Sequence, residues 1–339
     1  MHTRPVNRVP AKAPPAGHAA VGPARQRGMA VIAALLIVAA VTTIAAGLMY
    51  RQAAYVRSVQ SGQTRVALQA ALRGGLMLAE RVLKEDGAAD ARTHFGGAWS
   101  APIVDARLEQ MRGSRPPAPM FTGQLQDEQG KINLRTLVWE GNLNVDRVGR
   151  VRRLCQLVGV PPEIADRIAL RMLASQSASA DEGGEPGEGQ DAASGGARLP
   201  ASSAPMPRSL DDLRNIEGMT DEVIARLRPH VTILPSATLI NVNTASAEVL
   251  TAWFPQISEG LAKTLVGQRN SGQWFVNGPD FVNRLNLPDL APNSIRVTVN
   301  SNWFTLAGAA RLDRSVMLLH ALMVRTETGT RVIWSREGA

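Results

Sequence analysis

The chain has 339 residues, a formal net charge of +8 and a single cysteine. This length can bury a sizeable core and predicts more than one domain. A single cysteine excludes an intrachain disulfide, and the helical pattern around Cys155 predicts a small buried side chain rather than a reactive thiol. Five basic residues and no acidic residue lie in the first 28 positions, so the net charge from Met29 onward is only +3. That charge does not indicate a nucleic-acid-binding surface.

The segment Met29 to Tyr50 contains twenty-two consecutive uncharged residues. As a helix it would reach about 33 Å, enough to cross the roughly 30 Å hydrocarbon core of a bilayer. The residues before it include Arg25 and Arg27 and carry no acid, which predicts that the N-terminus stays in the cytoplasm and the remainder is exported. We therefore expect a cytoplasmic leader at 1–28 and a single transmembrane span at 29–50.

Gly28 stands immediately before this apolar run. A secretory signal peptide carries its small cleavage-site residues after the apolar run instead. The arrangement resembles the leaders of type IV prepilins and of the pseudopilins of type II secretion. That resemblance implies that a prepilin peptidase cuts between Gly28 and Met29 and methylates the new N-terminal residue. An ordinary signal anchor with a glycine at its edge is the alternative interpretation.

Ala33 is the fifth residue after the expected cut. Most pilins carry glutamate there, and a carboxylate inside the membrane is costly unless it pairs, here with the N-terminal ammonium of a neighbouring subunit. A subunit without this carboxylate cannot pair with a subunit ahead of it, which suits the first subunit of a filament. The absence resembles the minor pseudopilin K family of type II secretion, although an ordinary anchor helix would also contain alanine.

The helical pattern continues after the span. Apolar residues recur at three-to-four spacing from Leu68 to Leu83, which predicts an amphipathic helix over 51–87 that ends near Asp86 and Gly87. This would be the periplasmic half of one long N-terminal helix.

A loop-rich segment follows, and we expect 88–135 to begin an α/β body. The runs Met120–Leu125 and Lys131–Leu134 flank a polar segment that ends in Gly130. This pattern predicts a β-hairpin in which Gly130 supplies the left-handed turn residue.

An inserted helical domain is expected over 136–295. Its first helical pattern runs from Val145 to Leu173, with a break before Pro162, which fits the first turn of a second helix. The segment 175–207 is rich in Ser, Ala, Gly, Pro and acids, which predicts a disordered loop.

Two small helical units complete the predicted insertion. The first opens with a capping box of Ser209 and Asp212, and Thr220 caps the helix that follows it, which ends at Leu227. The second opens at Asn243–Thr244 and continues to Gln268.

The C-terminal region 296–339 is expected to form an antiparallel sheet. Its strand-like runs are Arg296–Asn300, Trp303–Leu312, Ser315–Thr326 and Arg331–Ser335. The fold class predicted from all these elements is α+β.

The resemblance to the minor pseudopilin K family extends over most of the chain. It rests on four segments in order, Gly130–Leu134, Leu213–Met219, Ile240–Leu250 and Val332–Trp334. It implies a pilin-like fold with a long N-terminal transmembrane helix, an antiparallel sheet and a large inserted helical domain with helix-hairpin-helix or SAM-like units. The implied role is to cap the tip of the periplasmic pseudopilus, and to help initiate its assembly, for export of folded proteins. The implied partners are minor pseudopilins I and J, the major pseudopilin, the prepilin peptidase and the inner-membrane assembly platform.

One departure from that family concerns calcium. Family members can bind calcium near an Asp-Trp-Ile-Asp sequence, where this chain has Arg171–Ala174. The weak candidate ligands are Asp181, Glu182 and Glu185, but a hard cation needs several convergent oxygens. We interpret these acids as a solvated loop and expect neither calcium nor another cofactor.

A DNA-binding protein and an enzyme are the two alternative classes of function. The segment Asn241–Leu285 resembles the helix-hairpin-helix module of competence DNA receptors, which would make the chain a membrane-anchored DNA-binding protein. Its hairpin Phe254–Ser258 lacks the glycines that let a backbone approach a phosphate, and we expect Lys263 and Arg269 to be solvated helix positions. Three widely separated histidines after the leader, in no metal-ligand spacing, give no support to an enzyme.

Overall fold

The computed structural model describes residues 26–104, 118–176, 204–287, 290–291 and 295–338, without the side chains of 26–28. These residues form two compact units that divide between Gln63 and Thr64. The leader residue Arg25 and most of the loop predicted at 175–207 lie outside the described residues.

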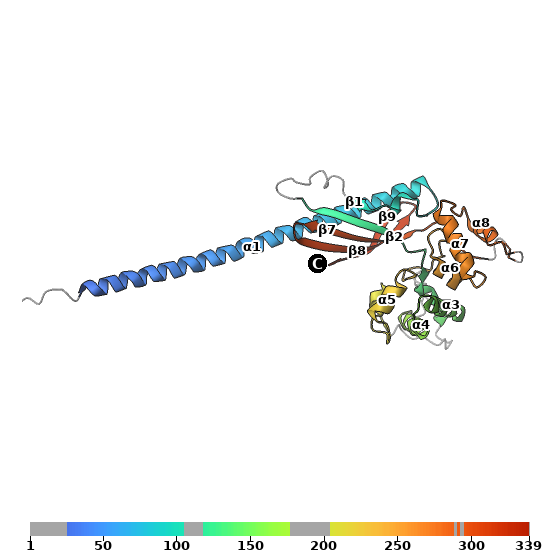
Figure 1. The fold of residues 1–339 in the computed structure, drawn as a ribbon, viewed down its shortest axis with the longest axis horizontal. Helices are drawn as coiled ribbons and strands as arrows, with labels where there is room; N and C mark the ends of the chain where they lie inside the picture. Colours follow the sequence, from blue (N-terminus) through green and yellow to red (C-terminus); the bar gives the residue numbers. More distant parts are fainter. Residues whose placement is uncertain (1–25, 105–117, 177–203, 288–289, 292–294, 339) are drawn as a thin grey trace, which may run out of the picture. The chain divides into compact units, whose positions relative to one another are not determined.

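Helix α1 runs without interruption from Gln26 to Ala89 (Figure 1). The predicted long helix is confirmed and ends two residues beyond Gly87. In the second unit the apolar stripe of α1 is buried, because three-to-four spacing places its members on one face. These residues are Leu68, Ala71, Leu72, Ala79 and Leu83.

The second unit contains a five-stranded antiparallel sheet with the order β1-β2-β7-β8-β9, drawn beside the later part of α1 in Figure 1. The last three strands form the predicted meander, and two of them have the predicted bounds. The strands are β1 Ile103–Val104, β2 Met120–Asp127, β7 Trp303–Leu312, β8 Ser315–Thr326 and β9 Gly329–Gly338.

The strand predicted at Arg296–Asn300 is wrong. Only Thr298 forms a bridge, with Asn241, and its backbone bonds Ile240 and Val242. The pairing is too short to make a strand, and three residues later Ser301 is buried, with its backbone N–H on the Thr93 hydroxyl and its own hydroxyl on Asp127.

The hairpin predicted around Gly130 is also wrong. Strand β2 pairs with β7 instead, and the short strand β3 (Ile132–Asn133) pairs in parallel with β6 (Val231–Thr232). Gly130 is not in the left-handed region, where Glu140, Asn286, Asp313 and five other glycines lie among the described residues. The polar run that resembles an exposed turn is buried, so the chain continues inward rather than reversing.

Phe121 of β2 fixes the distance between α1 and the sheet. Its ring is surrounded by Gly75 of α1, Gly123 of β2 and Gly308 of β7. A Cβ atom at Gly75 would lie 2.4 Å from the ring, so α1 can approach this closely only without a side chain there. The core around Phe121 includes Trp99, Leu125, Phe304, Leu306, Ala310, Leu319 and Met323.

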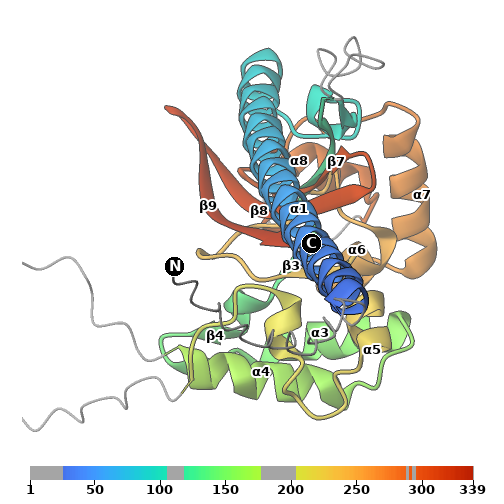
Figure 2. The same cartoon turned by 90° about the vertical axis from the view of Figure 1, so that its left-hand side faces the viewer.

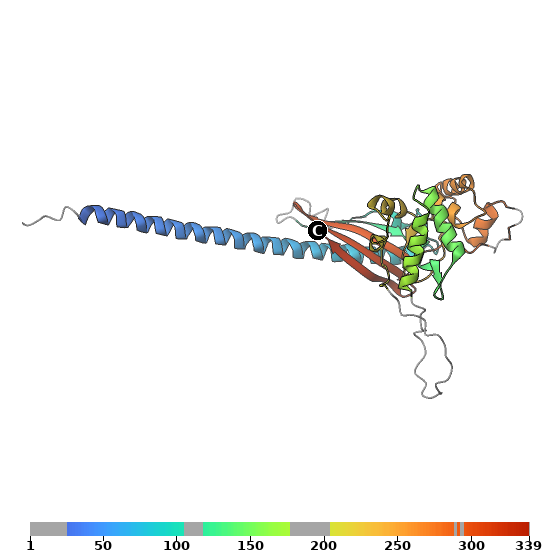
Figure 3. The same ribbon diagram turned by 90° about the horizontal axis from the view of Figure 1, so that it is seen from below.

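A second hydrophobic core belongs to the segment between β2 and β7, residues 129–302, which we call the helical body (Figure 2). Its helices α3 and α4 pack against each other and lie side by side in Figure 3, and α3 also contacts α6. The helices are α3 Val145–Leu157, α4 Glu163–Ser175, α5 Asp221–Leu227, α6 Ala247–Trp253, α7 Glu259–Asn270 and α8 Gly278–Arg284.

Five of the six described α-helices of the body begin at side-chain caps, and α4, which follows Pro162, has none. Thr220 caps α5 as predicted, and the Ser209–Asp212 capping box is present, although it opens a 3₁₀ turn, Leu210–Leu213. The helix predicted to open at Asn243–Thr244 begins later, at α6, which Ser246 caps. Asn243 lies in the interior instead, where its side chain forms hydrogen bonds with the backbone of Phe275.

The helical body leaves and rejoins the sheet at neighbouring positions. Asp127 at the end of β2 is the register partner of Phe304 in β7. The backbone N–H of Glu128 then donates to the carbonyl of Trp303 at 2.9 Å. The helical body is therefore an insertion between two strands that would otherwise form a β2–β7 hairpin.

Candidate functional site

The apolar half of α1 exposes its large side chains. Ile32, Leu36 and Ile44 are 60%, 66% and 64% exposed, and no residue of the most apolar window is buried. By length and composition this helix is able to cross a membrane. Such a surface is unfavourable in water and needs lipid or another apolar helix to cover it.

The residues of the expected processing site lie at the beginning of this helix. Arg27, Gly28 and Met29 fall within α1, whereas Arg25 lies outside the described residues. Ala33 is exposed on α1 and presents only a methyl group where a carboxylate would project. The cut between Gly28 and Met29 stays a prediction, as does the role of Ala33.

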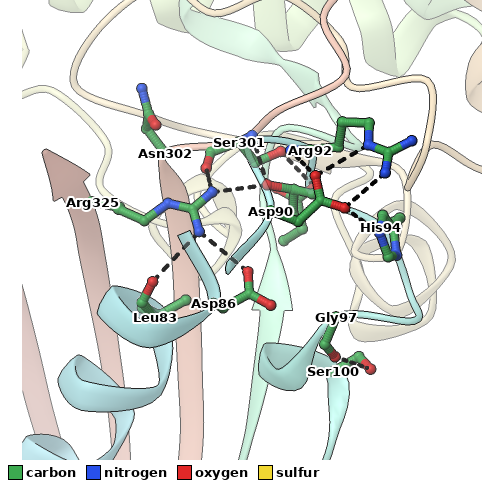
Figure 4. Close-up of polar contacts among 12 residues, drawn as sticks. Leu83, Asp86, Asp90, Arg92, His94, Gly97, Ser100, Ser301, Asn302 and Arg325 are labelled. Atoms are coloured by element: carbon green, nitrogen blue, oxygen red, sulfur yellow. Dashed lines mark hydrogen bonds and ion pairs between the residues drawn. The ribbon is translucent and has the colours of Figure 1, made fainter. Parts of the chain in front are cut away.

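Arg325 of β8 joins the end of α1 to the sheet, as Figure 4 shows. Its guanidinium forms a buried ion pair with Asp86 at 3.2 Å, and the two side chains are 11% and 6% exposed. It also donates to the Thr93 hydroxyl at 2.9 Å and to the Ser301 carbonyl at 2.7 Å. Removing one member of such a pair is costly, because it leaves the other buried charge uncompensated.

Asp127 forms the next part of this network. Its carboxylate accepts hydrogen bonds from the hydroxyls of Thr244 and Ser301, the amide of Asn241 and the backbone N–H of Gln129. Burial raises the pKa of Asp127, although these donors act in the opposite direction. The group therefore couples the end of β2 to residues of the helical body that are more than a hundred positions away.

Asn241 connects both sets of contacts. Its side-chain amide donates to the Thr93 carbonyl at 3.0 Å as well as to Asp127 and the Ser301 hydroxyl. We call Asp86, Thr93, Asp127, Asn241, Thr244, Ser301 and Arg325 the polar junction. Six of these seven residues are buried, and their hydrogen bonds connect the end of α1, the sheet and the helical body to one another.

A second buried ion pair borders the junction. Lys131 Nζ lies 2.8 Å from Glu128 Oε1, and that oxygen also accepts from the Thr305 hydroxyl at 2.7 Å. The polar residues predicted to form an exposed turn thus satisfy one another in the interior.

The groups considered for phosphate binding are already engaged. Arg269 is buried, and its guanidinium donates to the carbonyls of Val242 and Ala245 at 2.9 and 2.6 Å. Burial lowers the pKa of Arg269 to about 10. The expectation that Arg269 is solvated is therefore wrong, because its buried guanidinium holds the backbone of Val242 and Ala245. Lys263 is exposed and paired with Glu259 at 2.5 Å.

The hairpin between α6 and α7 buries Phe254 and Ile257. Its backbone is held by a bond from the Ile257 N–H to the Phe254 carbonyl at 3.0 Å. It packs inward and does not have the glycine-rich form that presents amides to a phosphate.

The histidines lie apart from one another. His94 contacts Asp90 at 3.2 Å and stacks on Trp274, with 4.5 Å between the ring centres. His230 bonds the Ser246 hydroxyl, and burial lowers the pKa of its imidazole, while His320 is exposed on β8. In the described part of the chain, no three His, Cys, Asp or Glu residues come together as a metal site.

The weak calcium candidates Asp181, Glu182 and Glu185 lie outside the described residues. Arg171, at the place of the family's acidic sequence, donates to the Pro205 carbonyl at 2.7 Å. Cys155 is buried in the helical body as predicted, and burial raises the pKa of its thiol to about 11.

Comparison with known proteins decides the family. Two family models described as type II secretion system, protein K match residues 130–236 and 240–300. The chain is also 30% identical to type II secretion system protein K of Pseudomonas aeruginosa over 325 residues, which cover 92% of each sequence. The chain belongs to the type II secretion system protein K family. The prediction of a minor pseudopilin is thereby confirmed, and α1 has the length and composition of a single-pass membrane anchor.

Other relatives agree. Protein K of Pectobacterium carotovorum subsp. carotovorum is 27% identical over 315 residues, which cover 86% of this chain and 90% of the relative. The fold resembles a chain in the crystal structure of the GspK-GspI-GspJ complex from the type 2 secretion system of enterotoxigenic Escherichia coli. That match has a TM-score of 0.59 and 17% identity, and covers 84% of this chain and 99% of that chain. The predicted fold class is confirmed.

Sequence reasoning missed the polar junction. The sequence places Asn241 in segments that resemble the family and a helix-hairpin-helix module, Thr244 at the opening of a helical unit and Asp127 in a turn, and it predicts no contact among the three. The signal that was available is the period of two in this strand, which places Asp127 on the same face as Phe121 and Leu125, where a buried carboxylate needs several donors.

Proposed function

We propose that this protein caps the tip of the pseudopilus and helps initiate its assembly, in complex with minor pseudopilins I and J. The observation that carries the proposal is that the helical body occupies the space at the C-terminal end of α1. Thr93, four residues after that helix, bonds Val299 through its N–H at 2.9 Å and Asn241 through its carbonyl. His94 and Phe95 then lie against Trp274 and Arg269 of the same body.

A filament grows by stacking subunits along their N-terminal helices. A further subunit placed beyond the end of α1 would collide with the helical body, so the body ends the filament on that side. The polar junction supports this steric role, because it resists bending of the body away from the sheet. This role is assembly rather than catalysis and requires no cofactor.

The membrane half of the protein would supply the contacts below the tip. We infer that the prepilin peptidase cuts between Gly28 and Met29 and that α1 stays in the inner membrane with its N-terminus towards the cytoplasm. The rest of the chain is then periplasmic. The exposed apolar face of α1 would pack against the helices of minor pseudopilins I and J, the major pseudopilin and the inner-membrane assembly platform.

The steric part is tested by replacing residues 129–302 with Asn-Gly. This dipeptide favours the type I′ turn that would join Glu128 to Trp303 directly, where the two strands already meet. We expect the shortened protein to enter the membrane and to allow longer pseudopili under overexpression of the major pseudopilin. Pseudopili of unchanged length, with the shortened protein present in them, would contradict the capping role.

Processing is tested separately by mass spectrometry of the protein isolated from membranes. We expect a chain that begins at N-methylated Met29, and Gly28→Leu should block the cut. An intact leader in cells with an active peptidase would make the chain an ordinary signal anchor. Co-purification of the full chain with minor pseudopilins I and J tests the proposed partners, and failure to recover both would contradict that part.

The absence of a metal requirement has its own test. We expect the melting temperature of the processed protein to change by less than about 1 °C between excess calcium and EDTA, because a bound ion would stabilise the folded state by mass action. A calcium-dependent rise of several degrees would restore the acidic segment as a calcium site.

A further inference from the structure

A hollow of about 800 Å³ opens on the surface of the helical body, at a place that the capping role does not use. It is bounded by the β4–β5 hairpin (Val138–Trp139 and Asn142–Leu143), the first turns of α3 and the segment after α6. Its volume falls in the range of binding sites for peptides and small molecules.

Three arginines line this hollow against one carboxylate, Asp146. Arg147 donates one hydrogen bond to the Thr136 carbonyl at 2.8 Å. The guanidinium carbon of Arg150 lies 5.1 Å from the centre of the Trp253 ring. Arg296 is exposed, and within the described residues no carboxylate pairs with any of the three. Burial, and after it the nearby charges of Arg150 and Arg296, lower the pKa of Arg147.

Two indoles stand at the same hollow. Trp139 is 61% exposed although it sits on a rigid element. The turn that carries it has Glu140 and Gly141 at φ 48° and 73°, the two left-handed positions of a tight type I′ hairpin. Trp253 is partly buried beneath Arg150. A large exposed aromatic side chain on a hydrogen-bonded hairpin is typical of a binding anchor, because the backbone loses little conformational entropy when the side chain is covered.

From this combination we propose that the hollow binds an acidic peptide segment of a partner protein, with its carboxylates on the arginines and an apolar side chain against Trp139. Guanidinium groups match carboxylates through paired hydrogen bonds, and the side chains of Arg296 and Arg150 donate no hydrogen bond to another described residue. A nucleic-acid strand fits the site less well, since the charge is gathered in one hollow and does not continue as a basic stripe.

The test uses the full-length protein in detergent and a short fluorescein-labelled peptide in which glutamate alternates with phenylalanine. Binding is followed by fluorescence anisotropy at low and at physiological salt. We expect saturable binding that weakens as the salt concentration rises. A peptide with glutamine in place of glutamate should bind with a Kd at least tenfold higher.

Charge reversal then locates the site. Arg296→Glu should weaken peptide binding at least tenfold, and it should leave folding intact because the side chain is exposed and forms no ion pair with another described residue. Arg314→Glu is the matched control, since Arg314 is also exposed and lies in the turn between β7 and β8, outside the hollow. Equal losses from both variants, or no loss from Arg296→Glu, would overturn the proposal.

The aromatic part has an independent test. Trp139→Ala should weaken binding several-fold, whereas Leu170→Ala, at a position on α4 that is 58% exposed, should not. Two competitors identify the ligand class. Inorganic phosphate should displace the peptide only at millimolar concentrations, and a labelled single-stranded oligonucleotide should bind more weakly than the peptide. An oligonucleotide that binds more tightly through Arg296 and Trp139 would overturn the assignment to an acidic peptide.

Discussion

The two halves of α1 carry similar apolar residues, but their surroundings differ completely. In the second unit, Leu72 and Leu83 are 1% and 0% exposed because the sheet covers them. In the first unit, Leu36 and Ile44 are 66% and 64% exposed. The difference shows which contacts this chain makes alone and which it leaves for lipid and for other subunits. The second unit should therefore be stable without the membrane half of α1. Contacts with other subunits of the filament should depend on that half.

The largest effect should follow Phe121→Ala. The Phe121 ring is 1% exposed and is held between three glycines, which have no side chains to fill the resulting cavity. We expect a loss of about 3–5 kcal/mol in the free energy of unfolding, measured by urea denaturation with tryptophan fluorescence. A loss below about 1 kcal/mol would mean that the sheet does not hold the second half of α1 as described.

The adjacent glycines of α1 sharpen the comparison. Gly75→Ala places a Cβ atom 2.4 Å from the Phe121 ring, whereas a Cβ atom at Gly74 meets nothing within 4 Å. We expect Gly75→Ala to destabilise by about 1–3 kcal/mol, because overpacking forces the ring or the helix to move. Gly74→Ala should stabilise by up to about 1 kcal/mol through helix propensity. Equal effects of the two substitutions in urea denaturation would contradict the close approach of α1 to the sheet.

A further distinction concerns pH. Among the described residues, every buried charged side chain belongs to the second unit. Burial raises the pKa of Asp127 above its ordinary value of 3.8, so the folded state holds this proton to higher pH than the unfolded chain. The stability that Asp127 contributes is full below pH 3.8 and is lost as the pH rises through the folded-state value.

This dependence is measurable as a difference. The free energy of unfolding of the wild type should fall relative to that of Asp127→Asn as the pH rises above 3.8, by up to about 1.4 kcal/mol per pH unit. Subtracting the variant removes contributions from other acids, such as Asp90, whose pKa is lowered by hydrogen bonds from Arg92. Parallel curves would show that the donors around Asp127 offset its burial fully.

The smallest effect on stability should come from the membrane half. Leu36→Ala removes a side chain that contacts nothing buried in its own chain, so we expect the unfolding of the second unit to change by less than about 0.5 kcal/mol. A loss comparable with that of Phe121→Ala would show that the membrane half stabilises the body.

Local patterns were sufficient for the long helix, the meander and most helices of the body. The apolar run, the three-to-four spacing and the strands Trp303–Leu312 and Ser315–Thr326 are properties of consecutive residues. The family assignment, which rests on the leader, Ala33 and four later segments of the sequence, is confirmed by relatives.

The errors arose where burial depends on residues distant in the sequence. Asp127 and its neighbours have the composition of an exposed turn, and only Asn241, Thr244 and Ser301 make their interior position possible. Arg269 looked like a solvated helix residue, and its two carbonyl partners precede it by more than twenty positions. No periodicity of the local sequence encodes either set of partners.

The buried cysteine has a practical consequence for mapping filament contacts. Cys155 is the single thiol of the chain, it is 0% exposed, and its pKa of about 11 leaves almost no thiolate at neutral pH. The wild-type protein should therefore not react with thiol-specific cross-linkers while it is folded. A cysteine placed at Ala33, Ala40 or Gly47 would be the one reactive thiol, and the subunit to which it becomes bridged would identify the neighbour of α1 at that depth.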